Sequence, residues 1–389
     1  MTDRATDRSL RPIPAPATLG MLGGGQLGRY FVTAAHELGY GVWVLDPDPA
    51  SPAGRVADRH LAAAYDDPAA VEELAAGCAA VTTEFENVPA ATLRTLAERT
   101  VVAPRAEAVA VCQDRIAEKT FLRDHGLPIG PVAVVTEAAD LDGADDALFP
   151  AVLKAARLGY DGKGQARVAD RTEARGAFAD LGSVPCVLER LLPLDLELSV
   201  VLARGADGAI EPFAVAENRH RDAILDVSLA PARVPDGLAD RAVEVAGRIA
   251  EALDYVGTLA VELFVAGGEL LVNELAPRPH NSGHLTLDAT VTSQYEQQVR
   301  ALCRLPLASP RPHSAAAMVN LLGDLWTDGG RTAPPWEAIL GDPALKLHLY
   351  GKAEARPGRK MGHLTVLAPS VEEALERALA AREAIGIVG

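Results

Sequence analysis

The stretch LAVELFVAGGELLVNELAPRPHNSGH, residues 259–284, carries the clearest information about the fold. Two runs of alternating apolar and polar residues flank Gly267-Gly268, and this pattern predicts a β-hairpin. If the turn centres on Gly268, Glu262 and Glu274 lie opposite each other on one face. Two facing carboxylates repel each other unless a cation or a proton lies between them. Oxygen ligands suit Mg²⁺, which also binds phosphate oxygens, so the hairpin is a candidate metal site.

Polar residues at the end of the hairpin and after it support this interpretation. Asn273 adds a neutral oxygen beside Glu274. The following loop contains a dense run of hydrogen-bonding side chains: Arg278, His280, Asn281, Ser282 and His284. A solvated hairpin with two surface glutamates is the common alternative, but such a run on a loop is typical of a binding surface.

Strand patterns dominate the sequence around the hairpin and predict an α+β domain over residues 113–305. Its expected strands are at 151–154, 187–189, 196–203, 210–216, 259–265 and 270–273, and its expected helices at 114–124, 172–181 and 239–253. A smaller C-terminal domain, residues 306–389, is expected to contain strands at 316–321, 346–349 and 364–367. Ser370 and Glu373 form a candidate capping box for a closing helix over 370–385.

The N-terminal part, residues 18–112, alternates strand and helix patterns instead. Strands are expected at 19–22, 42–45, 81–83 and 101–103, with helices after Gly25 and around 69–76 and 90–98. This alternation predicts a parallel, doubly wound sheet. The motif Gly23-x-Gly25-x-x-Gly28, with Asp46 at the end of the second strand, matches the fingerprint of a dinucleotide site. A nicotinamide-dependent enzyme is therefore one alternative that the sequence raises.

Composition narrows the class of protein. The chain has 389 residues and a net charge of −16, which argues against a general nucleic-acid or anionic-membrane surface. It contains no run of 18 apolar residues that would predict a membrane span. Its four cysteines, Cys78, Cys112, Cys186 and Cys303, form no CxxC pair, as expected of reduced thiols in the cytoplasm. Residues 1–17 lack a signal-peptide core, and we expect them to form a loose leader.

Two stretches of the central domain are candidates for phosphate binding. The segment LGYDGKGQ, residues 158–165, combines three glycines with Lys163, so its backbone amides could surround a phosphate. A hairpin turn is the simpler alternative. Lys154 closes an apolar strand, where a lysine is costly unless it meets an anion or extends to solvent.

Three further stretches carry candidate substrate residues. Glu84 and Glu86 follow a predicted parallel strand, at the edge where open α/β sheets bind ligands. His220 lies in ENRHRDAIL at a strand end, where a structural histidine is the more common case. The loop YGKAEARPGRKMGH, residues 350–363, gathers basic side chains suited to one phosphate, although solvated basic loops are common.

Together these motifs resemble those of the 5-(carboxyamino)imidazole ribonucleotide synthases, a family of ATP-grasp carboxylate–amine ligases. The segments that carry the resemblance are GGGQLGR at 23–29, QDR at 113–115, GYDGKGQ at 159–165, NELAPRPHNSGH at 273–284, MVNLLG at 318–323 and GRKMGH at 358–363. They stand in the family's order, and one departure is Leu158, where the family often has a glycine. The resemblance implies a nucleotide-like pre-ATP-grasp domain, a central ATP-grasp domain and a small C-terminal domain.

The resemblance also implies roles for individual residues. The ATP site would comprise Arg115, Lys154, Gly159, Tyr160, Asp161, Gly162, Lys163, Gly164, Gln165, Glu189, Arg190, Leu191, Leu192, Glu197, His220, Asn273 and Glu274. Glu262 and Glu274 would bind Mg²⁺ or Mn²⁺. The acceptor substrate would contact Gly25, Gln26, Leu27, Glu84, Glu86, Asn281, Ser282, His284, Lys352, Arg359 and Lys360. Lys154, Tyr160, Asp161, Lys163 and Lys352 would act in catalysis, with the segment 159–165 closing over the nucleotide.

The implied reaction is the carboxylation of the amine of 5-aminoimidazole ribonucleotide in purine biosynthesis, driven by ATP and bicarbonate through carboxyphosphate. The resemblance implies a cytoplasmic homodimer that uses neither NAD nor biotin and binds no nucleic acid or membrane. One alternative keeps the fold and changes the acceptor, as in a formate-dependent glycinamide ribonucleotide transformylase or a biotin carboxylase. A dinucleotide-dependent oxidoreductase and a non-catalytic nucleotide sensor are alternatives from other classes.

Overall fold

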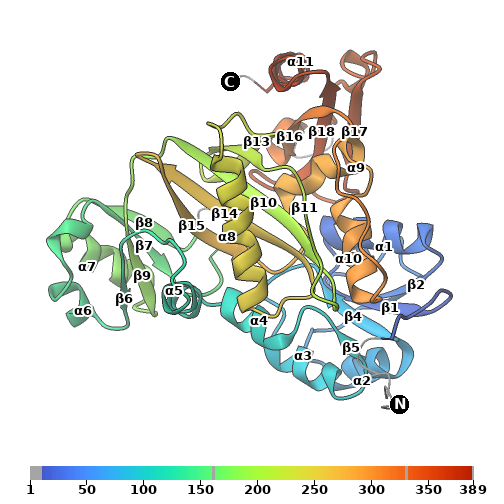
Figure 1. Ribbon diagram of the computed structural model, residues 1–389, viewed down its shortest axis with the longest axis horizontal. Helices are drawn as coiled ribbons and strands as arrows, with labels where there is room; N and C mark the ends of the chain where they lie inside the picture. The colour runs from blue at the N-terminus through green and yellow to red at the C-terminus, as the bar shows by residue number, and fades with distance from the viewer. Residues whose placement is uncertain (1–10, 160–162, 329–331, 388–389) are drawn as a thin grey trace, which may run out of the picture.

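Within residues 11–159, 163–328 and 332–387, which the computed structural model describes, the chain forms three β-sheets flanked by helices (Figure 1). The predicted hairpin belongs to the largest sheet. None of the described helices is long and apolar enough to cross a membrane.

The N-terminal sheet is parallel, with the strand order β3-β2-β1-β4-β5. Its elements are β1 (Thr18–Leu22), α1 (Gln26–Glu37), β2 (Gly41–Leu45), β3 (Arg59–Leu61), α2 (Pro68–Gly77), β4 (Ala80–Thr83), α3 (Ala90–Ala97), β5 (Val101–Val102) and α4 (Ala106–Cys112). Phe31 of α1 packs on one face, and Leu74 of α2 and Leu93 of α3 pack on the other. The predicted doubly wound sheet is therefore confirmed. Its strand order reverses at β1, so β1 and β4 end at the edge where such sheets bind ligands.

A second, antiparallel sheet has the order β6-β9-β7-β8. Its elements are α5 (Arg115–Asp124), β6 (Val132–Val135), α6 (Ala138–Asp142), η2 (Asp146–Leu148), β7 (Ala151–Ala155), β8 (Gln165–Val168), α7 (Arg171–Asp180) and β9 (Cys186–Arg190). Helix α5 begins after Asp114, whose carboxylate accepts hydrogen bonds from the amides of Ile116 and Ala117 at 3.0 and 3.3 Å. This cap fixes the position of Arg115 in the first turn.

The largest sheet follows the path β15-β14-β10-β12-β13-β16-β18-β17, and β11 pairs with β10. Its strands are β10 (Leu196–Arg204), β11 (Ile210–Pro212), β12 (Ala216–Arg221), β13 (Ile224–Ala230), β14 (Gly257–Ala266), β15 (Glu269–Ala276), β16 (Ala315–Leu322), β17 (Leu345–Leu349) and β18 (Lys360–Ala368). The helices of this part are α8 (Leu238–Ala252), η3 (Asn281–Leu285), α9 (Thr286–Ala289), α10 (Gln294–Leu302), η4 (Gly323–Leu325), η6 (Trp336–Ala338) and α11 (Val371–Ala384).

Helix α8 lies across β10 and β14 and covers one face of this sheet (Figure 1). Its Ile249 shares a buried apolar cluster with Leu198 and Val200 of β10 and Val261 of β14. Side chains alternate along a strand, so Glu197, Ser199 and Glu262 point to the opposite face. That opposite face carries the candidate site.

Several elements differ from the expectations. The strand expected at 210–216 covers β11, which ends at Pro212, and the first residue of β12, and both strands pair with β10. The C-terminal strands β16, β18 and β17 extend the central sheet through the β13–β16 pairing. The closing helix is α11, and the Ser370 hydroxyl accepts from the Glu373 amide at 3.3 Å, which is one half of the predicted capping box.

Candidate active site

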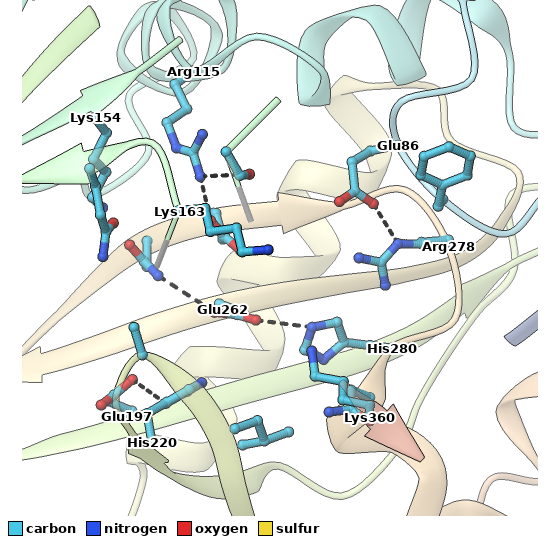
Figure 2. Close-up of a pocket in the computed structure, with 18 of the residues that line it drawn as sticks. Glu86, Arg115, Lys154, Lys163, Glu197, His220, Glu262, Arg278, His280 and Lys360 are labelled. Atoms are coloured by element: carbon cyan, nitrogen blue, oxygen red, sulfur yellow. Dashed lines mark hydrogen bonds and ion pairs between the residues drawn. The ribbon is translucent and has the colours of Figure 1, made fainter. Parts of the chain in front are cut away.

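A cavity of about 1040 Å³ collects side chains from all three sheets, and Figure 2 shows part of it. The predicted site residues that line it are Gly25, Gln26, Leu27, Glu84, Glu86, Arg115, Lys154, Gly159, Lys163, Gln165, Glu189, Arg190, Leu191, Leu192, Glu197, His220, Glu262, Asn273, Glu274, Asn281, Lys352, Arg359 and Lys360. Gly164, Ser282 and His284 are not among its lining residues. Tyr160, Asp161 and Gly162 lie outside the described residues.

The β14–β15 hairpin presents Glu262, Asn273 and Glu274 to the cavity. Gly267 and Gly268 have φ values of 57° and 79°, the positive values that a type I′ turn requires. This two-residue turn would by itself pair Glu262 with Asn273. A bulge shifts the register so that Glu262 pairs with Glu274 and Asn273 becomes the extra residue. The predicted pairing is confirmed, but the bulge causes it, not a turn centred on Gly268.

The two facing carboxylates have different surroundings. Nε2 of His280 lies 3.0 Å from Oε1 of Glu262 (Figure 2). Nη2 of Arg115 lies 3.6 Å from Oε2 of Glu274. Burial would raise the pKa of Glu262, but the hydrogen bond from His280 holds it well below its usual range. Desolvation and the negative charge of Glu262 raise the pKa of Glu274. The pair is therefore a place where a bound cation would relieve repulsion.

Lys154 meets an anion within the protein. Its Nζ lies 2.7 Å from Oε2 of Glu189, and Nζ of Lys119 lies 3.4 Å from the other oxygen of the same carboxylate. Burial would raise the pKa of Glu189, but the charges of Lys119 and Lys154 lower it. Lys119 also donates to the backbone carbonyl of Asn273 at 2.5 Å. It thereby links β9 of the antiparallel sheet to β15 of the largest sheet across the cavity.

Glu197 and His220 form a second pair, from β10 and β12. Nδ1 of His220 lies 2.7 Å from Oε2 of Glu197 (Figure 2). Burial would lower the pKa of His220, but the hydrogen bond and charge of Glu197 raise it overall. The structure thus brings together the two residues expected to face the ribose and the nucleotide.

The glycine-rich loop before α1 binds carboxylates of its own chain. Glu84, at the end of β4, accepts hydrogen bonds from the amides of Gly25 and Gly28, and Asp46 accepts one from Gly24 at 2.7 Å. A Cβ atom on Gly25 would lie 2.5 Å from Oε1 of Glu84, so glycine is needed for this close approach. Burial raises the pKa of Glu84 despite the two amides. The amides of Gly24, Gly25 and Gly28 are therefore not free for a dinucleotide pyrophosphate or a substrate phosphate in this conformation.

Glu86, also from the end of β4, is paired across the cavity. Its Oε2 lies 2.6 Å from Nε of Arg278, which follows β15 (Figure 2). Burial would raise the pKa of Glu86, but the charge of Arg278 and its hydrogen bond lower it. This ion pair joins the N-terminal sheet to the loop after the carboxylate hairpin.

The basic loop, residues 350–363, contributes cationic side chains to the cavity wall. Lys352, Arg359 and Lys360 line the cavity, and Nζ of Lys352 donates to the carbonyl of Lys360 at 2.7 Å. Two arginines of the N-terminal part bind this loop, because Arg29 donates to Tyr350 O at 3.3 Å and Arg55 to Gly351 O at 2.9 Å. The loop therefore presents three cationic side chains to the same cavity as the residues expected to bind the nucleotide.

Ser282 and His284 support the cavity wall from behind. The Ser282 hydroxyl lies 2.7 Å from that of Ser199, and Nδ1 of His284 lies 2.7 Å from the Tyr295 hydroxyl. Both side chains are buried beneath the Asn281 turn. They remain predicted substrate residues, although neither faces the cavity here.

Comparisons with known proteins place the chain in a family. Three family models match consecutive parts of it: a ribonucleotide synthetase preATP-grasp domain at residues 16–113, an ATP-grasp domain at 120–295, and a phosphoribosylaminoimidazole carboxylase C-terminal domain at 316–377. The N5-carboxyaminoimidazole ribonucleotide synthase of Brucella melitensis is 45% identical over 365 residues, which cover 93% of this chain and 98% of that protein. This chain belongs to the N5-carboxyaminoimidazole ribonucleotide synthase family.

Solved structures of the synthase family share the whole architecture. The synthetase from Thermus thermophilus has a TM-score of 0.88 and 40% identity, covering 95% of this chain and 99% of that one. The synthase from Aspergillus clavatus, in complex with ADP and 5-aminoimidazole ribonucleotide, has a TM-score of 0.88 and 31% identity, covering 95% and 98%. The resemblance and the fold class predicted from sequence are thus confirmed.

The synthase resemblance also implies a metal ion, and the residues present fit magnesium. Among the described residues, no group of three or more His, Cys, Asp and Glu side chains could hold a metal ion by themselves. Two carboxylates are enough for Mg²⁺, which keeps several waters and takes phosphate oxygens as further ligands. Oδ1 of Asn273 is buried beside them without a hydrogen-bond partner. These three side chains therefore offer oxygen ligands to an ion shared with a nucleotide.

Two buried residues near the cavity escaped the sequence analysis. Lys119 lines the cavity, and the neighbouring Glu118 accepts from the Leu275 amide at 2.9 Å. Leu122 follows them at helical spacings of four and three residues, and all three side chains are buried. Charged residues in line with a buried leucine were a signal available in the sequence.

Leu158, the departure from the family motif, has a φ of 62°, a value that favours glycine.

Proposed function

We propose that this protein catalyses the reaction of ATP, bicarbonate and 5-aminoimidazole ribonucleotide to give ADP, phosphate and N5-carboxyaminoimidazole ribonucleotide. The observation that carries the proposal is a single cavity with two chemically different ends in a chain 45% identical to a synthase of that name. One end combines paired carboxylates with lysines, and the other is the basic loop. The relative from Aspergillus clavatus, crystallised with ADP and 5-aminoimidazole ribonucleotide, supports binding of both ligands by a cavity of this kind.

We assign the nucleotide to the end formed by the largest sheet and the four-stranded antiparallel sheet. Glu189, Arg190, Leu191 and Leu192 would contact the adenine, and the Glu197–His220 pair would contact the ribose. Arg115, Lys154 and Lys163 line the cavity beside the carboxylate hairpin, where their charges would stabilise the phosphates. When bound, Mg²⁺ on Glu262 and Glu274 would neutralise charge on the phosphate oxygens.

We assign the acceptor ribonucleotide to the other end. Lys352, Arg359 and Lys360 would bind its phosphate as a local cationic site in an otherwise acidic protein. Glu86 and Asn281 also line the cavity, and we assign them to the part of the acceptor between its phosphate and its amine. The amine of the acceptor would therefore lie near the γ-phosphate end of the nucleotide.

The chemistry consists of two displacements. An oxygen of bicarbonate attacks the γ-phosphorus of ATP, and the bond from phosphorus to ADP breaks, which gives carboxyphosphate. The acceptor amine then attacks the carboxyl carbon, and the carbon–oxygen bond to phosphate breaks as phosphate leaves with the amine proton. Lys154, Lys163 and Arg115 stabilise the negative charge that develops in the first step, and positioning accounts for most of the remaining rate enhancement.

The test is ADP release by the purified protein with Mg-ATP, adding bicarbonate and 5-aminoimidazole ribonucleotide separately and then together. We expect strong stimulation only with both, and one ADP for each aminoimidazole consumed. ATP hydrolysis that ignores the ribonucleotide would overturn the substrate assignment and favour a ligase for another acceptor. A homodimer and a cytoplasmic location also remain predictions, and light scattering of the purified protein checks the first.

A further inference from the structure

A row of buried polar side chains crosses the face of the largest sheet that carries the site. Ser199 pairs with Glu262, and Asn218 pairs with both Glu197 and Ser228. Directly paired residues of antiparallel strands share a face, so these side chains lie on the face opposite α8. Ser199 and Ser228 are completely buried, and Asn218 is 6% exposed. Buried polar groups are costly unless they are hydrogen-bonded, so their partners are informative.

The hydrogen bonds of this row form a chain with one direction. Ser228 donates its hydroxyl to Oδ1 of Asn218 at 2.7 Å, and Nδ2 of Asn218 donates to the Ser199 hydroxyl at 2.9 Å. The hydroxyl oxygens of Ser199 and Ser282 lie 2.7 Å apart, and Ser199 donates in this contact when Ser282 gives its own proton to His280. The Ser282 hydroxyl then lies 2.8 Å from Nδ1 of His280.

The last link fixes which nitrogen of His280 carries the proton. The backbone amide of Ser282 points at Nδ1 of His280 at 3.3 Å, and an amide can only donate. Nδ1 is therefore an acceptor for both the amide and the hydroxyl of Ser282. The ring proton belongs on Nε2, which lies 3.0 Å from Oε1 of Glu262 (Figure 2).

The backbone of His280 is held from the other side. Gln294, which begins α10 and is fully buried, accepts from the His280 amide at 2.8 Å and donates to the His280 carbonyl at 2.7 Å. Ring and backbone are thus both fixed, so the imidazole has one orientation toward the carboxylate hairpin.

We infer that Ser199, Asn218 and Ser228 are positioning residues that act through Ser282 to hold His280 as an Nε2–H donor to Glu262. The inference rests on the proposed role of Glu262 in binding the metal with the nucleotide. Glu262 is then held at both oxygens, at Oε1 by Nε2 of His280 at 3.0 Å and at Oε2 by Nδ2 of Asn273 at 3.5 Å, which fixes the orientation of the carboxylate toward the cavity. Outer partners of this kind typically change metal affinity 10–100-fold when removed. The same chain connects the Asn281 turn, at the acceptor end, to the carboxylate at the nucleotide end.

The first test reads the tautomer directly and needs neither metal nor activity. Metal-free protein labelled with ¹⁵N-histidine is examined by NMR at neutral pH, and His280→Gln identifies the resonances of His280. We expect a protonated Nε2 and an unprotonated Nδ1, with a shift toward a mixture of tautomers in Ser199→Ala. A protonated Nδ1 in the unmodified protein would overturn the inference, whatever the substrate of the enzyme proves to be.

The second test measures the Mg²⁺ dependence of ADP release at saturating ATP. Ser199→Ala should raise the Mg²⁺ concentration for half-maximal rate about tenfold, with a smaller effect on kcat. Ser228 lies at the end of the hydrogen-bond chain farthest from His280. Ser228→Ala should shift the half-maximal Mg²⁺ concentration in the same direction, and it replaces Ser199→Ala as the test if that variant does not fold. Thr365→Val is the matched control, because this buried hydroxyl on β18 has no hydrogen-bond partner among the described residues. An Mg²⁺ dependence equal to that of the control in both serine variants would overturn the inference.

Discussion

Glu274 is the side chain on which the proposed metal site depends most directly. It faces Glu262 across the bulge and has Arg115 at 3.6 Å as its ion-pair partner. Glu274→Gln removes one charge and keeps the shape of the side chain. We expect kcat for ADP release to fall about 10²-fold or more, while the thermal unfolding midpoint changes little. Glu269→Gln, exposed on the same strand, is the control. Full turnover in Glu274→Gln would contradict the metal assignment.

Glu118 makes the free energy of unfolding depend on pH. Burial raises the pKa of Glu118 to about 8 from its ordinary value of 4.5. The folded state therefore holds a proton that the unfolded state releases, so this contribution to stability is present below about 4.5 and is lost as pH rises through about 8. Glu118→Gln keeps an acceptor for the Leu275 amide and has no proton to lose. In urea unfolding across this pH range, the free energy of unfolding of Glu118→Gln should rise relative to that of the unmodified protein as the pH increases. A constant difference would contradict the prediction.

At the scale of elements, the N-terminal caps of α5 and α7 allow an effect on stability to be distinguished from an effect on ATP binding. Asp114 caps α5 and pairs with Arg157 at 2.9 Å, and Asp170 caps α7 through the Thr172 and Glu173 amides at 2.8 and 2.9 Å. Replacing either by alanine should lower the free energy of unfolding by about 1 kcal/mol in urea titrations. Only Asp114→Ala should also raise KM for ATP, because Arg115 stands in the first turn of α5. Equal KM values in the two variants would show that the α5 cap does not position Arg115.

The hairpin and α10 show what the sequence could and could not predict about elements. Alternation and Gly267-Gly268 predicted the hairpin and the facing glutamates, but a bulge at Asn273 leaves no pattern, because it depends on how the strands pair. Helix α10 was missed because its buried face includes Gln294, Gln297 and Gln298, which break the apolar period. These glutamines are buried because each binds backbone or side-chain groups of other elements, a tertiary effect that one sequence window does not contain.

At the scale of the whole molecule, a cluster of rings joins the N-terminal part to the C-terminal strands. The imidazole of His363 stacks between those of His284 and His348, at centroid distances of 4.4 and 4.5 Å. Tyr30 of α1 contacts all three rings. The sequence analysis singled out individual residues of this cluster but did not predict that they contact one another, because β16–β18 were not expected to extend the central sheet.

This cluster predicts sensitivity to acid. Burial lowers the pKa values of His284 and His363 well below the ordinary value of 6.5. Below about pH 6.5 these histidines bind protons in the unfolded chain but stay neutral in the folded protein. The free energy of unfolding should therefore fall as the pH drops below about 6.5. Urea unfolding at about pH 7.5 and 5.5 measures the loss. His363→Gln should lose less than the unmodified protein, whereas His313→Gln, an exposed site, should follow it. Parallel losses in all three proteins would contradict the prediction.

The carboxylate of Glu84 has a consequence beyond this chain. It satisfies two amides of a glycine turn whose spacing is shared with dinucleotide-binding proteins, from a position 56 residues after Gly28. The anion-binding turn is thus already occupied by a carboxylate of the same chain, which follows β4, the strand beside β1 in the sheet. A glycine motif in another doubly wound domain can therefore be sorted by inspecting a distant residue. Glutamate at the end of the strand that lies beside the first strand on the side away from the second, as β4 lies beside β1 here, indicates a turn filled by its own chain.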